Sequence, residues 1–472
     1  MSQLLVLERE RDIRARLGSL PKDLEATYDD IYATIQKQEG SKPEVAIRAL
    51  QWVIASSIDL RADIVLAAVC QSADDMELQQ IDVSVDFILS SCQNLLVLDQ
   101  ANTFRLSHIS VREYLEDNHP QLILDGISLT AYICLRLLIN PNNWMISAGY
   151  SMPIQYVTST PAERIEIEEV ETRYLPANHE SLGLESIQLD SELRREVSNI
   201  RRAHQNPTVG PGAFLIDYAR FSWPHHCHAM EDIDDHAFTA LELEFLGSLE
   251  ASGSAYRRWY HILEATYLRN RFESNLYPHL DILEPVTSIL PPICLFGLKK
   301  ALEEVGSKVA LPTSFTTERG LSLLVLAVMG GHIQMVEFLL ENDADVNALQ
   351  FRGPGSALAT AAERGDEKIV RILLENGADV NVCLRSPLRS ALATAARRYG
   401  NEATVRVLLE HGADVNHTPM GSFYGPPLLS AIGSGDERIM RAFVEYGVDI
   451  YAQLRNVGGA EDIIPFLLEL RT

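Results

Sequence analysis

The sequence predicts a mostly α-helical chain of 472 residues, with one small β-hairpin and a C-terminal solenoid of stacked helix pairs. Three observations support this fold class. A motif of two helices and a turn occurs four times in the last third of the chain. Near the N-terminus, a stretch with strand periodicity follows three segments of helical periodicity. Between these regions, apolar and aromatic residues recur at helical spacing, which predicts a helical linker.

The first predicted domain covers residues 1–118 and consists of helices and one hairpin. Its first three helices are predicted over residues 24–35, 43–54 and 64–70. Residues 94–98 and 104–108 read as two strands around a polar turn, which predicts the hairpin. Another helix starts at Ser110. Three helices followed by a hairpin is the layout of a winged-helix domain.

Two segments of this domain resemble a known module. Ser19–Ile35 (SLPKDLEATYDDIYATI) and Phe104–Asp117 (FRLSHISVREYLED) look like the winged helix that follows the NTPase domain in fungal NACHT–ankyrin proteins. Those proteins are STAND NTPases related to the animal NOD-like receptors. The module is often labelled after GPI inositol-deacylases, but the chain has no GxSxG nucleophile elbow, so we expect no hydrolase chemistry.

The resemblance also gives a possible role to His108. In the family, an upstream P-loop holds the nucleotide, and the histidine of an H-x-S-x-x-E-Y/F-L motif resembles a phosphate-sensing residue. His108 occupies that position, but this sequence contains no GxxxxGK[ST] motif and too few preceding residues for an NTPase domain. We therefore expect a structural role for His108 near the start of the Ser110 helix. A surviving nucleotide contact is the alternative.

The predicted third helix lacks the residues of a DNA-recognition helix. Residues 61–70 contain one arginine and one aspartate and are otherwise apolar. Sequence readout needs several basic or amide side chains directed at phosphates and base edges. The net charge of −25 also argues against nucleic acid as a partner. We therefore expect protein partners and no direct nucleic-acid binding.

Residues 119–289 are predicted to form a helical linker domain, with an apolar helix over 129–139. The stretch Phe214–Cys227 (FLIDYARFSWPHHC) resembles the linker of the same fungal family. Residues 225–228 (HHCH) contain possible metal ligands, but consecutive residues on a helix point in different directions. Zinc sites use spacings such as i, i+4 or CxxC, so we predict no metal site.

The third predicted domain, residues 290–472, contains the fourfold motif. In each copy, a helix rich in small residues precedes a second helix, which in three copies ends in Ala-Asp-Val-Asn. The equivalent alanines of the first helices are separated by 34, 34 and 36 residues and are Ala327, Ala361, Ala395 and Ala431. A period in the low thirties with two helices per unit is typical of ankyrin repeats, which stack and bind other macromolecules.

The repeats are assigned to residues 317–350, 351–384, 385–420 and 421–453. Residues 290–316 are predicted to be a degenerate repeat that caps the N-terminal end of the array. Residues 454–472 are predicted to hold only the second helix of a fifth repeat. Left-handed backbone conformations are expected after the second helices, at Asp343, Gly377, Gly412 and Gly447.

The motif also departs from the usual ankyrin sequence at the start of each first helix. Thr-Pro-Leu-His is replaced by Ser356-Ala-Leu-Ala359 and by Ser390-Ala-Leu-Ala393. The serines can still cap their helices. The histidine that ties neighbouring repeats together is missing, so we expect modest stability.

The partner-binding surface is expected at the turn tips and on the exposed face of the first helices. The candidate residues, six of which are arginines, are Phe351, Arg352, Arg364, Arg385, Arg389, Arg397, Arg398, Met420, Phe423 and Tyr424. Arginine and aromatic residues carry much of the binding energy at protein interfaces. We therefore predict that an acidic or polar protein segment binds here. A solvated face without a partner is the alternative.

Three features predict the compartment. The six cysteines are scattered without CxxC pairs, which is typical of thiols in a reducing environment. The first residues carry charges where a signal peptide needs an apolar stretch. No apolar run of the length of a membrane span is evident. We expect a cytoplasmic or nuclear protein that does not enter a membrane.

The sequence thus predicts a non-enzymatic adaptor or scaffold that needs no cofactor and binds other proteins through its ankyrin repeats. Two alternatives remain open. In the first alternative, the chain is a nuclear transcription co-regulator that acts through protein contacts. In the second, it is the regulatory half of a STAND NTPase whose P-loop another chain supplies.

Overall fold

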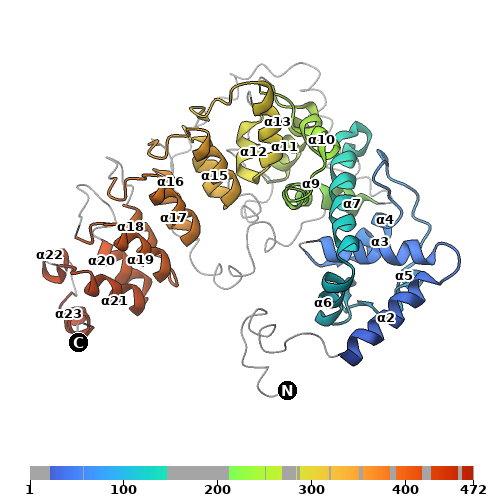
Figure 1. Cartoon of the computed structure of the whole chain (residues 1–472), viewed down its shortest axis with the longest axis horizontal. Coiled ribbons are helices and arrows are strands. Elements are labelled where there is room, and N and C mark those ends of the chain that lie inside the picture. Colours follow the sequence, from blue (N-terminus) through green and yellow to red (C-terminus); the bar gives the residue numbers. More distant parts are fainter. Residues whose placement is uncertain are drawn as a thin grey trace. The chain divides into compact units, whose positions relative to one another are not determined.

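The structure is a computed structural model of the whole chain. It describes residues 22–56, 58–145, 212–249, 251–267, 283, 288–317, 320–349, 355–382, 390–416, 427–454 and 460–470. The chain divides into two compact units (Figure 1). Unit 1 contains residues 1–248 and 252–281, and unit 2 contains residues 249–251 and 282–472. The boundary predicted at residue 118 falls inside unit 1, and the boundary predicted at residue 289 lies close to this division.

The first elements of unit 1 that the structure describes are four helices and a small sheet. The helices are α2 (Lys22–Gln36), α3 (Lys42–Ala55), α4 (Ala62–Ala68) and α5 (Val85–Ser91). The strands β1 (Leu60–Arg61), β2 (Leu96–Leu98) and β3 (Thr103–Leu106) form an antiparallel sheet in the order β1-β3-β2. The predicted hairpin is confirmed as β2–β3. The sequence analysis missed β1 and α5.

These two elements have weak sequence signals for physical reasons. Strand β1 is only two residues long and exists because Leu60 and Arg61 pair with Phe104 and Thr103 of the hairpin. Helix α5 has seven residues, and its N-cap Ser84 accepts a hydrogen bond from the Phe87 N–H at 3.2 Å. Both elements depend on tertiary contacts, because such short segments are unstable alone.

The rest of the described part of unit 1 is helical. Its elements are α6 (Ile109–Asn118), α7 (Pro120–Ile139), the 3₁₀ helix η2 (Pro141–Met145), α9 (Ala213–Ala229), α10 (His236–Leu246) and α11 (Ser254–Tyr267). Helix α9 carries three closely spaced aromatic side chains. Tyr218 and Trp223 are buried, Phe221 is half-buried, and the Trp223 ring lies 5.4 Å from that of Trp259 of α11, measured between ring centres.

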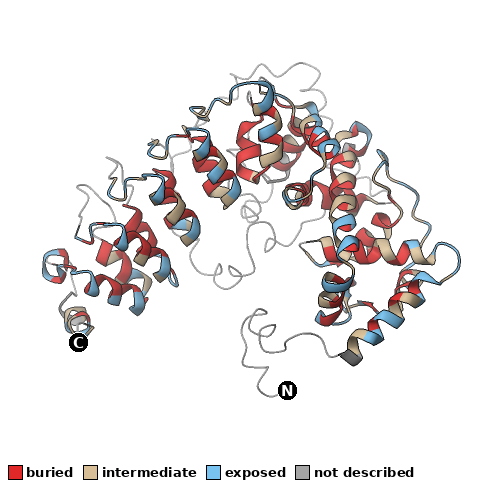
Figure 2. Ribbon diagram, in the orientation of Figure 1, coloured by how far each residue is buried: buried red, intermediate tan, exposed pale blue. Residues whose placement is uncertain are grey.

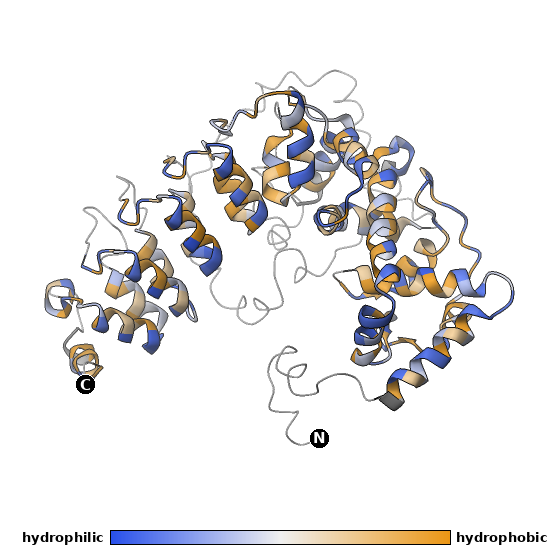
Figure 3. Cartoon of the chain, viewed as in Figure 1, coloured by the Kyte–Doolittle hydropathy of each residue, from blue (hydrophilic) through white to orange (hydrophobic). Residues whose placement is uncertain are grey.

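Helix α7 corrects one prediction about the sequence. It is 20 residues long and apolar enough, by length and composition, to cross a membrane, although no such stretch was expected. Half of this stretch is buried within the protein (Figure 2), and apolar residues extend along most of its length (Figure 3). It packs against α3, α9 and α10. This packing identifies α7 as a core helix of unit 1.

Unit 2 is a row of helix pairs. The pairs are α12 (Leu290–Phe296) and α13 (Lys299–Lys308), α14 (Leu323–Gly330) and α15 (Ile333–Glu341), α16 (Ala357–Arg364) and α17 (Glu367–Glu375), α18 (Ala391–Ala396) and α19 (Glu402–Glu410), α20 (Pro427–Ser434) and α21 (Glu437–Glu445), and α22 (Ile450–Leu454) and α23 (Ala460–Glu469). First helices contact first helices along the row, and second helices contact second helices. The small residues of α16 and α18 are all buried and allow this close stacking. Only the last two residues of α16, Glu363 and Arg364, are not buried.

The predicted local features of the repeats are largely confirmed. Ser356 and Ser390 cap α16 and α18, since their hydroxyl oxygens accept hydrogen bonds from the Ala359 and Ala393 N–H groups at 3.1 and 3.2 Å. The backbone φ angles after the second helices are positive and measure 62° at Asp343, 85° at Gly377, 86° at Gly412 and 80° at Gly447. One prediction about the last repeat was wrong. It has a short first helix, α22, in addition to the second helix α23.

Candidate functional site

The candidate site on unit 2 is only partly within the described residues. Seven of the ten predicted residues lie outside them, namely Phe351, Arg352, Arg385, Arg389, Met420, Phe423 and Tyr424. The other three are Arg364, Arg397 and Arg398, and all three lie where a first helix ends.

Arg364 and Arg398 connect neighbouring repeats. Arg364 donates a hydrogen bond from Nη1 to the carbonyl oxygen of Met329, 35 residues earlier, at 2.7 Å. Arg398 donates from Nη1 to the carbonyl oxygens of Glu363 and Arg364 at 3.0 and 2.8 Å. The accepting carbonyls are at the C-terminal ends of the preceding first helices, where they lack partners within the helix and carry partial negative charge. The structure therefore gives Arg364 and Arg398 a role inside the array, which the sequence analysis did not foresee.

Arg397 lies beside this contact and is exposed, at the C-cap of α18. Tyr399, two residues further along the chain, is 59% exposed and was missed by the sequence analysis. A signal for it existed, because the third repeat has one more residue between its alanine (Ala395) and the following glycine (Gly400) than the second repeat has. That extra residue lengthens the turn in which Tyr399 lies.

The turn that holds Tyr399 is attached to the next repeat. Gly400 has a positive φ of 81° and donates a backbone hydrogen bond to Oδ2 of Asp436 at 2.8 Å. Asp436 is almost completely buried and also caps α21 by accepting from the Arg438 N–H at 3.0 Å. These hydrogen bonds and the Arg438 guanidinium hold the pKa of Asp436 below its ordinary value despite its burial, so the carboxylate stays ionised. The turn is therefore fixed where Arg397 and Tyr399 are displayed.

A second set of contacts joins the turn after the second helix of one repeat to the same turn of the next repeat. Asn347 donates from Nδ2 to the Gly377 carbonyl oxygen at 3.0 Å and accepts at Oδ1 from the Asp379 N–H at 2.8 Å. Asn381 and Asn416 make the same pair of contacts with the repeats that follow them. The asparagine that ends each motif is thus the link to the next repeat. These links and the arginine contacts join neighbouring repeats at positions that the sequence analysis did not predict.

The degenerate first repeat is joined to the array through His332. The Nε2 atom of His332 lies 3.0 Å from the carbonyl oxygen of Leu295, at the end of α12. Gly297, at φ 69°, leaves room for the imidazole, since a Cβ atom there would lie 2.3 Å from His332 Cγ. Like Arg364 and Arg398, His332 thus contacts a carbonyl oxygen near the end of the first helix of the preceding repeat.

His108 in unit 1 caps a helix. Its Nδ1 accepts a hydrogen bond from the Ser110 N–H at 3.1 Å and lies 2.6 Å from the Ser110 hydroxyl, at the start of α6. The Ser110 hydroxyl also lies 2.7 Å from the Tyr28 hydroxyl of α2. A role for His108 in sensing a nucleotide stays a prediction.

The HHCH run also has an internal role. His226 is completely buried, with Nε2 at 2.7 Å from the Tyr218 hydroxyl and Nδ1 at 3.3 Å from the Thr130 hydroxyl of α7. Burial lowers the pKa of His226 well below its ordinary value, so the ring is neutral. The adjacent Cys227 is buried as well, and burial raises its pKa. Among the described residues, no three His, Cys, Asp or Glu side chains are grouped to hold a metal ion.

Comparison with known proteins concerns the C-terminal part of the chain. A family model described as "Ankyrin repeats (3 copies)" matches residues 298–383, and one described as "Ankyrin repeat" matches residues 388–418. A crystal structure of the human ASB11 ankyrin repeat domain is 23% identical and covers 39% of this chain and 83% of its own, with a TM-score of 0.32. The comparison with curated proteins gives no match. The C-terminal region of the chain therefore carries ankyrin repeats.

Proposed function

We propose that the chain is a non-catalytic adaptor whose ankyrin repeats bind another protein. Ankyrin repeats generally mediate protein–protein interaction, since each repeat adds one unit to a continuous surface. The observation that carries the proposal is the pair Arg397 and Tyr399, which is exposed on a turn fixed to the next repeat through Asp436. Because the backbone of the turn is held by Asp436, binding there costs little backbone ordering, and arginine and tyrosine are residue types that carry binding energy at interfaces.

The partner we propose is an acidic or polar protein segment. Arg397 and Arg398 are both exposed and adjacent, and guanidinium groups form directional, paired hydrogen bonds with carboxylates. Arg398 uses Nη1 to hold the preceding helix end, so it positions the turn as well as adding charge. The seven candidate residues outside the described ranges remain part of this proposed surface.

For unit 1 we propose a winged-helix module that contacts protein. The element order α3-β1-α4-α5-β2-β3 and the strand order β1-β3-β2 support this assignment. Helix α5, directly before the hairpin, has the sequence VDFILSS and no basic residue, so it is poorly suited to DNA phosphates. Descent from a fungal NACHT–ankyrin receptor, and a cytoplasmic or nuclear location, belong to the same proposal.

Affinity capture with defined variants tests the adaptor function. The full chain and an Arg397→Glu/Tyr399→Ala variant are used to capture proteins from a cell lysate, and the captured proteins are identified by mass spectrometry. We expect a partner that the unchanged chain retains and the double variant loses. Arg371→Glu, on the outer side of second helix α17, is the matched charge control. Equal capture by all three chains would show that this turn is not the binding surface.

A further inference from the structure

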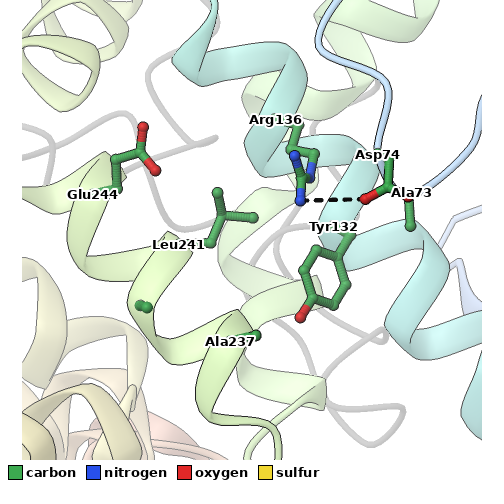
Figure 4. Close-up of a pocket in the computed structure, with 8 residues that line it drawn as sticks. Ala73, Asp74, Tyr132, Arg136, Ala237, Leu241 and Glu244 are labelled. Carbon is green, nitrogen blue, oxygen red and sulfur yellow. Dashed lines mark ion pairs between the residues drawn. The ribbon is translucent and has the colours of Figure 1, made fainter.

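One cavity of unit 1 is already satisfied by the chain itself. It measures about 450 Å³, and its lining includes three alanines, Leu241 and Glu244 (Figure 4). The Arg136 guanidinium lies 5.9 Å from the centre of the Tyr132 ring, and its Nη2 atom lies 3.6 Å from the Asp74 carboxylate. The cation, the ring and the anion therefore satisfy one another within the wall, and the lining selects no ligand of its own.

In unit 2, the exposed turn between α18 and α19 is connected to the repeats on both sides. We call residues 397–400 the Tyr399 turn. Towards the second repeat, the side-chain amide of the following residue, Asn401, donates to a carbonyl oxygen of α16 at 3.1 Å. Towards the fourth repeat, the Gly400 N–H donates to Oδ2 of Asp436 at 2.8 Å. The order of the turn therefore depends partly on the fourth repeat.

One carboxylate serves both the Tyr399 turn and the start of α21. The Oδ1 atom of Asp436 accepts from the Arg438 N–H at 3.0 Å and so caps α21, while Oδ2 accepts from Gly400. Because the two oxygens belong to one rigid group that is almost completely buried, the cap orients the oxygen that Gly400 uses. The cap exists only while the first turn of α21 is formed. Folding of α21 and ordering of the turn thus share a side chain.

Helix α21 is also held against α19 beyond its first turn. Arg406 of α19 donates from Nη1 to Oε2 of Glu445, at the end of α21, at 2.8 Å. Phe443, within α21, is completely buried. An opening of α21 away from α19 would break these contacts and carry Asp436 away from Gly400.

We propose that the Tyr399 turn and α21 form one coupled unit, so that the turn is fully ordered only when the fourth repeat is folded. A local opening of α21, which costs less free energy than unfolding the whole chain, would release the turn on one side. Conversely, a partner bound to the ordered turn would stabilise α21, since coupling between two sites is reciprocal. The effect on partner binding rests on the proposed function, whereas the coupling itself does not.

Amide hydrogen exchange of the full chain, followed by NMR, tests the coupling. Arg441→Gly weakens α21 at an exposed position and should speed exchange at both Phe443 and Gly400 by the same factor, about fivefold for a glycine within a helix. Arg371→Gly is the matched control, because Arg371 occupies the equivalent position of α17 and forms the equivalent ion pair with a glutamate four residues earlier. It should speed exchange in α17 and leave Gly400 unchanged.

Asp436→Asn separates the turn from the helix. Asparagine caps helices about as well as aspartate, but the NH₂ group that replaces Oδ2 cannot accept from Gly400. Exchange at Gly400 should therefore become about tenfold faster while Phe443 stays protected. In this chain, adding Arg441→Gly should have no further effect on Gly400, because the coupling is already lost.

Two outcomes would overturn the coupling. They are exchange at Gly400 that does not respond to Arg441→Gly although Phe443 does, and exchange at Gly400 that responds equally to Arg371→Gly. Unchanged exchange in α17 of the Arg441→Gly chain verifies that the rest of the array is folded. Because hydrogen exchange needs no partner, failure of the capture experiment would affect the adaptor proposal alone.

Discussion

Asn381 and Gly412 are 31 residues apart in sequence, and the Asn381 side-chain amide donates a hydrogen bond to the Gly412 carbonyl oxygen at 3.0 Å. The same side chain accepts a hydrogen bond from the Asp414 N–H at 2.8 Å. One amide group thus satisfies two backbone groups of the next repeat. In a row of repeats whose stability comes largely from contacts between neighbours, such links determine how far the stack is cooperative.

Replacing Asn381 with alanine should lower the free energy of unfolding by about 1–2 kcal/mol, since two hydrogen bonds between repeats are lost. Urea denaturation followed by circular dichroism measures the change. Asn376→Ala is the matched control, because the Asn376 amide bonds only within its own helix, to the Ile372 carbonyl oxygen. A cost for Asn381→Ala no larger than that for Asn376→Ala would contradict the proposed linking role.

Arg364 should matter more for stability than a surface arginine of the same array. Its loss in Arg364→Ala leaves the Met329 carbonyl without its cationic donor, and we expect a cost of about 1.5–3 kcal/mol. Arg371 forms a partly exposed ion pair with Glu367 at 3.0 Å, so Arg371→Ala should cost less than about 1 kcal/mol. Thermal and urea unfolding of the two variants decide the order. The reverse order would show that the link to Met329 adds nothing.

Two glycines of the array should respond to alanine in opposite directions. A Cβ atom at Gly330 would lie 2.2 Å from the Leu295 carbonyl oxygen, so Gly330→Ala must displace the backbone or His332 and should cost about 1–3 kcal/mol. Gly433 of α20 has no atom within 4 Å of that position, and Gly433→Ala should stabilise by about 0.5–1 kcal/mol. Melting temperatures provide the comparison. Equal effects at both sites would rule out the close approach at Gly330.

The stability of unit 1 should depend on pH through the buried side chain of His226. Burial lowers the pKa of His226, so the ring stays neutral in the fold at pH values where the unfolded chain binds a proton there. The unfolded state then holds more protons, and stability falls as the pH drops below about 6.5. The fall is at most about 1.4 kcal/mol per pH unit and group.

Urea unfolding at pH 7.5, 6.5 and 5.5 measures this slope. A His226→Gln chain should show a shallower slope, because it lacks the buried histidine that takes up a proton on unfolding. A His236→Gln chain, changed at a side chain that is 91% exposed, is the control. An unchanged slope in His226→Gln would mean that His226 is protonated in the fold or does not contribute.

His108 should contribute to folding but not to nucleotide binding by this chain alone. His108→Ala removes the cap of α6 and should cost about 0.5–2 kcal/mol, measured by urea unfolding. Calorimetric titration of the full chain with ATP or GTP should give no binding heat, since the sequence has no P-loop. Binding heat that disappears in His108→Ala would instead support an NTPase partner that completes the site.

The repeat region could be predicted because its pattern is local. Ser356 caps its helix through an N–H three residues away, and the positive φ at Gly377 belongs to the turn directly after its own helix. Such features need no information from distant residues. Strand β1 and helix α5 were missed because Leu60 becomes a strand only by pairing with Phe104, and α5 is too short to give a clear period.

The candidate site was only partly predictable for the same reason. Residue type marked Arg364, Arg397 and Arg398 as interface residues, but it could not show that Arg364 bonds to Met329 or that Arg398 bonds to Glu363. Those partners lie 35 residues away and come close only when the repeats stack. Tyr399 was overlooked because its exposure depends on a turn that Asp436, from the next repeat, holds in place.

The stacked helix pairs of ankyrin type follow from local sequence patterns, because apolar periodicity, caps and turn residues act within a few positions. The packed structure was needed to show which arginines join neighbouring repeats, which remain exposed beside Tyr399, and where three alanines leave a pocket beside Tyr132. Hydrogen bonds and cavities of this kind depend on distances between residues far apart in the chain, and those distances are set by packing.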